Sequence, residues 1–166
     1  LVTYTVDLRP MYYQLLSFGS DDGGVLKGIQ GAQDLKYSDA NKIFEWGVWM
    51  NGPAIGGWDI RGKWGSGLRL DLLAKMHDDG TTGGDATAGD SIYTVQFKYQ
   101  KNSTDVGMEF KFGVHAEDNE SGFGLNHIEN IDINNPTVAS QFGSINPNRY
   151  NAWNFDKKQP GTLSVE

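Results

Sequence analysis

The sequence contains no cysteine, so neither a disulfide framework nor a thiolate metal site can form. Its three histidines lie in separate segments without a helical His-x-x-x-His pair, and a catalytic zinc site is therefore not expected. Neither a Gly-x-Ser-x-Gly segment nor a phosphate-binding loop is present. A pair of glycosidase carboxylates cannot be inferred either, because some pair always lies close among 21 Asp and Glu. We expect a protein that is not an enzyme.

Positive charge and long apolar runs are also scarce. Lys and Arg number 14 and leave a net charge of -7. Nonspecific binding to nucleic acid depends on cations that neutralise phosphates, so nucleic acid is not an expected partner. No apolar run approaches the roughly 18 residues that span a membrane, and no membrane insertion is expected. No signal peptide is visible, although a start at Leu1 is compatible with one that has been removed.

Glycine and aromatic residues are abundant instead. The chain has 22 Gly, five Trp, seven Tyr and eight Phe. Many glycines with few charged residues indicate a fold with many turns, as in all-β proteins. The aromatic residues have two interpretations that both stay open at this point. They can fill the core between two sheets, or they can be exposed and stack on the flat faces of sugars.

Alternation of apolar and polar residues predicts strands and no helix. The predicted strands are residues 2–8, 12–18, 25–29, 43–50, 68–73, 92–99 and 108–114. In the last of these the alternation directs Glu109 and Lys111 outward. The segment 117–147 is rich in Asn, Asp and Gly and is predicted to be a long loop. We expect one domain over residues 1–166, a two-sheet antiparallel β-sandwich, with 156–166 as a tail or edge strand.

The segment His77 to Asp90, HDDGTTGGDATAGD, concentrates acidic residues among glycines. Its carboxylates are hard oxygen ligands of the kind that calcium prefers, and calcium takes six to eight of them. The spacing does not match an EF-hand loop. Two interpretations remain, a calcium loop and an array of acidic β-turns without metal. The candidate metal ligands are Asp78, Asp79, Asp85 and Asp90.

Three short segments together resemble starch-binding modules of the glucoamylase type. They are GPAIGGWD (52–59), MEFKF (108–112) and NPNR (146–149), in the order that the family has them. The resemblance implies that Trp58 stacks on a sugar ring, while Lys111 and Asn148 donate hydrogen bonds to sugar hydroxyls. Phe142 stands one residue from the place of the family's second stacking ring. Independently of the resemblance, the polar, glycine-rich context of Trp64 favours an exposed ring.

A second resemblance concerns DDGTTGGDATAGDSIYTVQF, which begins at Asp78. It is similar to a segment that precedes a core strand in secreted bacterial modules with an immunoglobulin-like sandwich, and it has Ser91 where that segment usually has Gly. This resemblance implies an immunoglobulin-like fold and secretion.

Two functions are compatible with these features. The first is a noncatalytic carbohydrate-binding module of a secreted protein, which holds an associated enzyme on an α-glucan-like polysaccharide by raising its effective concentration. The second is a structural or adhesive extracellular surface protein, such as a filament subunit. Such a subunit self-associates when its sheet accepts a strand from a neighbouring copy.

Overall fold

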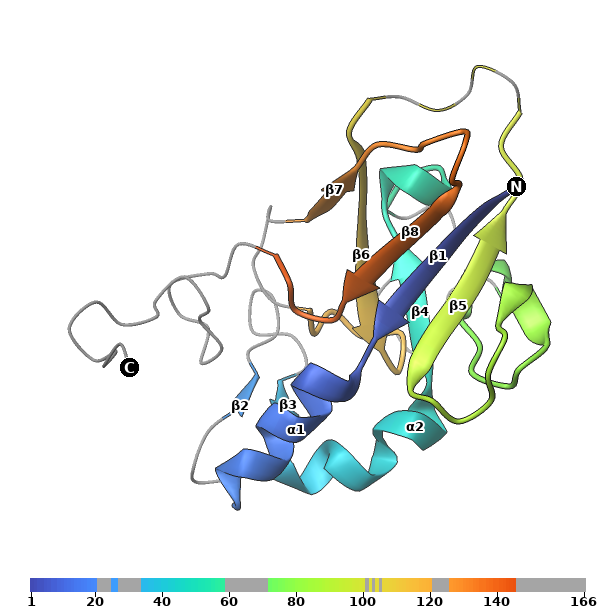
Figure 1. Cartoon of the computed structure of the whole chain (residues 1–166). Coiled ribbons are helices and arrows are strands. Elements are labelled where there is room, and N and C mark those ends of the chain that lie inside the picture. The colour runs from blue at the N-terminus through green and yellow to red at the C-terminus, as the bar shows by residue number, and fades with distance from the viewer. Residues whose placement is uncertain are drawn as a thin grey trace, which may run out of the picture.

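The computed structural model describes residues 1–20, 25–26, 34–58, 72–100, 102, 104, 106–120 and 126–145. Its strands are β1 (Val2–Asp7), β2 (Val25–Leu26), β3 (Leu35–Lys36), β4 (Val48–Asn51), β5 (Ile92–Phe97), β6 (Met108–Val114), β7 (His127–Glu129) and β8 (Thr137–Gln141). The helices are α1 (Arg9–Phe18) and α2 (Ile43–Trp46), with short 3-10 helices at Tyr37–Lys42, Pro53–Ile55, Leu72–Ala74 and Thr82–Gly84. The described chain is thus mostly strands with few helices, consistent with the predicted all-β class (Figure 1).

The first three-stranded sheet has the order β5-β1-β8. β1 runs antiparallel to β5, with Val2 opposite Phe97, and parallel to β8, with Thr3 opposite Thr137. The prediction of a purely antiparallel fold is therefore wrong for the β1–β8 pair. The reason is that β8 enters the sheet at the end where β1 begins, so that the amide of Thr3 donates to the carbonyl of Pro136.

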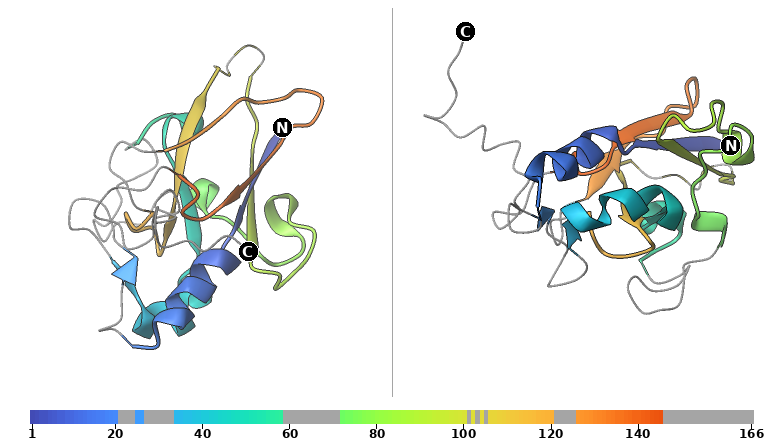
Figure 2. Two further views of the ribbon diagram at one scale, coloured as in Figure 1. Left: turned by 60° about the vertical axis from the view of Figure 1, so that its left-hand side comes forward. Right: turned by 90° about the horizontal axis from the view of Figure 1, so that it is seen from below.

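The second three-stranded sheet has the order β4-β6-β7 and is antiparallel throughout, while β2 and β3 form a separate two-stranded sheet. Both larger sheets contribute to one core. The ring of Tyr4 in β1 meets that of Phe110 in β6 edge-on, with 5.2 Å between the centroids. Every second residue of β1 is buried, which is the pattern of a strand with one face on a core. Figure 2 shows the two sheets from two further directions.

Residues 12–18, predicted as a strand, belong to helix α1, so this prediction is wrong. Pro10 lies in the first turn, where its fixed φ fits a helix and its missing amide hydrogen leaves no bond unmade. Met11 and Leu15 are four residues apart and place one buried stripe on the helix. Gly19 ends the helix with a φ of 70°, a conformation that glycine adopts readily.

The predicted strand 43–50 is correct only in its second half. Residues 43–46 form helix α2, which ends at Gly47 with a φ of 79°, and β4 follows directly. Phe44 lies in this helix and is exposed.

Some of the remaining predicted segments agree with the structure and others do not. β1, β2, β5 and β6 fall within the predicted strands, whereas the expected long loop 117–147 contains β7 and β8. The predicted strand 68–73 lies outside the described residues up to residue 71, after which the chain forms the 3-10 helix Leu72–Ala74. The predicted tail 156–166 also lies outside them.

Candidate functional site

The five residues predicted to bind carbohydrate do not form an exposed group in the described structure. Trp58 is partly buried, whereas Lys111 and Phe142 are both only 2 % exposed. Trp64 and Asn148 lie outside the described residues. The outward, solvent-facing position predicted for Lys111 is therefore wrong, and Phe142 offers no ring face to a sugar because it belongs to the core.

Lys111 is buried although it alternates along β6 with the core residues Phe110 and Phe112. Its Nζ donates to the carbonyl oxygen of Glu120 over 3.2 Å. Burial lowers the pKa of the Lys111 ammonium to about 8, and the nearby carboxylates of Glu120 and Asp118 oppose part of that shift. Burial raises the pKa of Asp118 in turn, and Lys111 opposes that change. Alternation along the strand cannot anticipate this burial, because the acceptor for Nζ comes from the turn after β6 and lies outside the strand.

That turn takes the place of a neighbouring strand. β7 pairs only with residues 108–110, so the amides of Phe112 and Val114 need other acceptors. Phe112 donates to Oε1 of Glu120 over 3.0 Å, and Val114 donates to Oδ1 of Asn119 over 2.9 Å. Asn119 returns a bond from Nδ2 to the carbonyl of Val114. Two side chains thus hold the chain against the second half of β6.

Trp58 packs against the chain rather than standing free. A Cβ added to Gly52 would lie 3.2 Å from Cη2 of Trp58 and 3.0 Å from the carbonyl oxygen of Glu109. Gly52 has a φ of 122°, so both its conformation and its crowding require glycine. The glycine of the GPAIGGWD segment therefore makes room for the indole.

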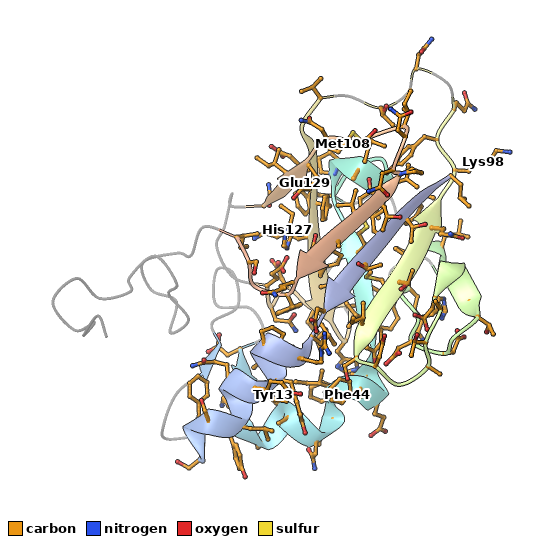
Figure 3. The ribbon with its side chains drawn as sticks, viewed as in Figure 1. Tyr13, Phe44, Lys98, Met108, His127 and Glu129 are labelled. Atoms are coloured by element: carbon orange, nitrogen blue, oxygen red, sulfur yellow. The ribbon has the colours of Figure 1, made fainter. Side chains whose placement is uncertain are left out.

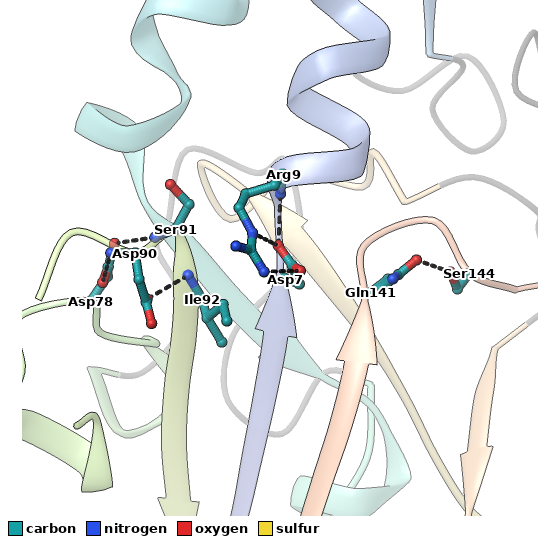
Figure 4. A network of polar contacts seen from close by, with 8 residues as sticks. All are labelled: Asp7, Arg9, Asp78, Asp90, Ser91, Ile92, Gln141 and Ser144. Atoms are coloured by element: carbon teal, nitrogen blue, oxygen red, sulfur yellow. Dashed lines mark hydrogen bonds and ion pairs between the residues drawn. The ribbon is translucent and has the colours of Figure 1, made fainter. Parts of the chain in front are cut away.

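The acidic loop is organised around Asp78. Its Oδ1 accepts the amide of Gly89. Its Oδ1 also accepts the amide of Asp90, and its Oδ2 accepts the amide of Ser91 (Figure 4). Partial burial nevertheless raises the pKa of Asp78, and these amide bonds oppose the rise. Ser91 has a φ of 65°, in the left-handed region that glycine favours. One carboxylate thus joins the two ends of the loop in front of β5.

Three of the four predicted metal ligands come together. Asp78, Asp85 and Asp90 each offer a carboxylate oxygen, and these oxygens lie within 4.8 Å of one another. We refer to them as the three-aspartate cluster. Asp85 is buried and also accepts the amide of Gly80 over 2.6 Å. Three carboxylates at this spacing fit a hard cation such as calcium, which prefers oxygen ligands.

The fourth predicted ligand, Asp79, is not part of the cluster. Its Oδ1 accepts the amides of Thr81 and Thr82, and hydrogen bonds led by those from Thr82 lower the pKa of Asp79. Asp79 therefore shapes the local turn.

Sequence reasoning missed a group of rings at the end of the molecule formed by α1 and α2 (Figure 3). Tyr12 contacts Tyr13 on one side, with centroids 5.9 Å apart, and Phe44 on the other, with centroids 5.1 Å apart. Tyr13 is 60 % exposed and Phe44 is 38 % exposed. We refer to these three residues as the aromatic surface. Pro10 and Gly19 were the available signals, because they mark the ends of the helix that carries two of the rings.

Comparisons with protein families, with curated proteins and with solved structures found no match for this chain. Among the helices in the described part of the chain, none is long and apolar enough to cross a membrane.

Proposed function

We propose that the chain is a noncatalytic carbohydrate-binding module of a secreted protein, with an immunoglobulin-like sandwich fold, and that it binds an α-glucan-like polysaccharide. The observation that carries the proposal is the aromatic surface, where two exposed rings are held in place by the partly buried Tyr12. The resemblance of the segments 52–59, 108–112 and 146–149 to starch-binding modules and the similarity of the acidic loop to loops of secreted sandwich modules support it. The left-handed conformation of Ser91, at a position usually occupied by Gly, agrees with that loop similarity.

The strength expected of such a surface follows from the area that it buries. A sugar on one ring removes about 50 to 100 Å² of apolar surface from water, which corresponds to about 1 to 2.5 kcal/mol. Loss of translational and rotational freedom opposes binding by several kcal/mol. Two rings with a few hydrogen bonds therefore give a dissociation constant no tighter than about micromolar. Weak contacts of this kind suit a module that acts on a repetitive polymer.

Calcium is part of this proposal as a structural ion. The three-aspartate cluster would hold the ion in the loop that precedes β5, where the three carboxylates otherwise repel one another. Bound calcium would fix the acidic loop on the sheet and leave the aromatic surface to contact the polymer.

The test is retardation in a native gel that contains soluble starch. Tyr13→Ala and Phe44→Ala should each reduce retardation by about tenfold in apparent affinity, because each removes one stacked ring. Ile133→Ala is the matched control, since it removes an apolar side chain that is 86 % exposed and outside the aromatic surface. A wild-type protein that migrates unchanged in every soluble glucan would refute the proposal.

One observation favours the second candidate, a structural or adhesive surface protein that self-associates by strand addition. β8 is an edge strand of the described sheet and is paired with β1 alone. An unpaired strand edge presents amide and carbonyl groups that a strand from another copy can bind.

A further inference from the structure

A pocket of about 420 Å³ lies beside the edge strands β7 and β8. None of the residues that the sequence predicted to bind carbohydrate or metal lines it. We name it the β7–β8 pocket. Its volume falls within the roughly 300 to 1,000 Å³ of small-molecule sites. Hydroxyl, amide, imidazole and carboxylate side chains line it, among them Thr5, His127, Glu129, Ser140, Gln141 and Ser144.

His127 is a firmly held part of this wall. Its ring, in a residue only 6 % exposed, stacks on Phe110 with 5.2 Å between centroids and 7° between planes. Its Nε2 lies 2.8 Å from Oε2 of Glu120, which is itself 1 % exposed and also accepts the amides of Phe112 and Gly143. A carboxylate that holds Nε2 fixes the orientation of the imidazole. His127 lines the pocket, and Nδ1 is the ring nitrogen that Glu120 does not hold.

The charges around the pocket exclude an anion. Asp7 in the wall accepts bonds from Nε and Nη2 of Arg9 at 2.9 and 2.8 Å, so each charge of this pair is matched by the other (Figure 4). Glu129 adds an exposed carboxylate. The wall is therefore negative overall and repels phosphate or carboxylate groups.

A metal ion and an apolar ligand fit no better. Both oxygens of Asp7 accept hydrogen bonds from Arg9 and are not free to bind a metal. In the described part of the chain, the three-aspartate cluster is the one set of side chains close enough together to hold a metal. Ile92 and Ala139 also line the pocket, but a wholly apolar ligand would remove the hydroxyls of Thr5 and Ser140 from water without replacing their hydrogen bonds.

We propose that the β7–β8 pocket binds one neutral, hydroxyl-rich sugar unit. Sugar hydroxyls donate and accept at once, and the wall offers both kinds of partner. Ser144 Oγ donates to Oε1 of Gln141 over 3.3 Å, which leaves the Gln141 amide hydrogens to donate to a ligand. Glu129 supplies an acceptor, and Nδ1 of His127 meets the ligand from the buried side. This site is separate from the aromatic surface and does not depend on it.

The experiment is a titration followed by amide resonances, with maltose, glucose and inorganic phosphate as probes. Maltose or glucose should shift the amides of His127, Glu129, Gln141 and Ser144, with a dissociation constant of about millimolar. Glu129→Gln should weaken binding about tenfold, because it removes a charged acceptor. Ser144→Ala should weaken binding about threefold. Asp132→Asn is the matched control, since it removes an exposed charge outside the pocket and keeps the oxygen that accepts the amide of Asn134.

The outcomes separate this inference from the proposed function. Sugar-induced shifts confined to Tyr12, Tyr13 and Phe44 would overturn the pocket and leave the polysaccharide surface standing. Shifts confined to the pocket, with no retardation in starch gels, would do the reverse. Pocket shifts with phosphate alone, no pocket shift with either sugar, or unchanged sugar affinity in both pocket variants would each overturn the pocket.

Discussion

Lys111 alternates along β6 with the core residues Phe110 and Phe112, yet its ammonium group is buried and donates to the carbonyl of Glu120 in the turn 117–120. Strand periodicity predicted exposure on this face of β6, but Asn51 and Trp49, which pair with Lys111 and Gly113 on the same face, are buried too. The same turn buries Glu120 and places it against His127. Both contacts depend on a turn that closes after the strand, and no local pattern in MEFKF contains that information. The three-aspartate cluster could be predicted, because its members are close in sequence.

The burial of Lys111 predicts a pH-dependent stability. The folded protein releases this proton near pH 8, whereas the unfolded chain keeps it until about pH 10.5. The unfolded chain therefore binds more protons between these values, and stability should rise with pH across that window by up to about 3 kcal/mol. Lys111→Met should lack this rise in urea unfolding followed by fluorescence.

The comparison between wild type and Lys111→Met isolates the contribution of Lys111 to the pH dependence of stability. Tyr93, whose pKa burial raises to about 12, is present in both and cancels in the difference. Lys98→Met provides the control, because Lys98 is exposed and its removal should leave the pH profile unchanged. Wild type and Lys111→Met with parallel profiles between pH 8 and 9.5 would contradict the assigned burial.

At the scale of elements, alternation identified β1, β5 and β6 and failed at α1 and α2. The run YYQLLSF has apolar residues at both strand and helix spacing, so periodicity alone cannot decide between them. Pro10 before it and Gly19 after it are the chemical signals of a helix start and a helix end. Giving these signals priority over a short alternation would have predicted α1. It would also have placed Tyr13 on an exposed helix surface.

The acidic loop yields a prediction at the same scale. Calcium at about 100 times its dissociation constant should stabilise the fold by about 2.7 kcal/mol and raise the melting temperature. Asp90→Asn should remove most of that gain, because it takes one carboxylate from the three-aspartate cluster. It keeps the oxygen that accepts the amide of Ile92.

Asp79→Asn is the matched control for calcium. It removes the same charge from the same loop, retains the acceptor for Thr81 and Thr82, and lies outside the cluster. Equal calcium responses in Asp79→Asn and Asp90→Asn would argue against a specific site, as would a melting temperature that is the same in calcium and in chelator.

At the scale of the whole molecule, the sequence correctly indicated a mostly β chain, and the structure joins its two larger sheets through one core. The sequence could not indicate that β1 is the central strand of its sheet. That position depends on pairing with β8, which lies at the far end of the described chain. Such pairing is set by tertiary packing and the path of the turn at Asp132–Pro136, not by the local pattern of either strand.

The two candidate functions predict different solution masses. A carbohydrate-binding module should sediment as a monomer at all concentrations, and its net charge of -7 favours separation of copies. A subunit that adds a strand at β8 should form polymers that persist on dilution. Sedimentation velocity over a hundredfold range of concentration separates these outcomes, and persistent polymers would favour the structural protein.

The parallel pairing of β1 with β8 also constrains the order of events during synthesis. β1 leaves the ribosome well before β8, so one of its two neighbours is complete only after residue 141 has been added. Until then, the backbone amides and carbonyls of β1 on the edge away from β5 have no partner strand. Contacts so distant in sequence slow folding and prolong the exposure of an unpaired, aggregation-prone strand edge. A nascent chain halted before residue 137 should therefore depend on chaperones, whereas one released after residue 145 has the strand that closes that edge.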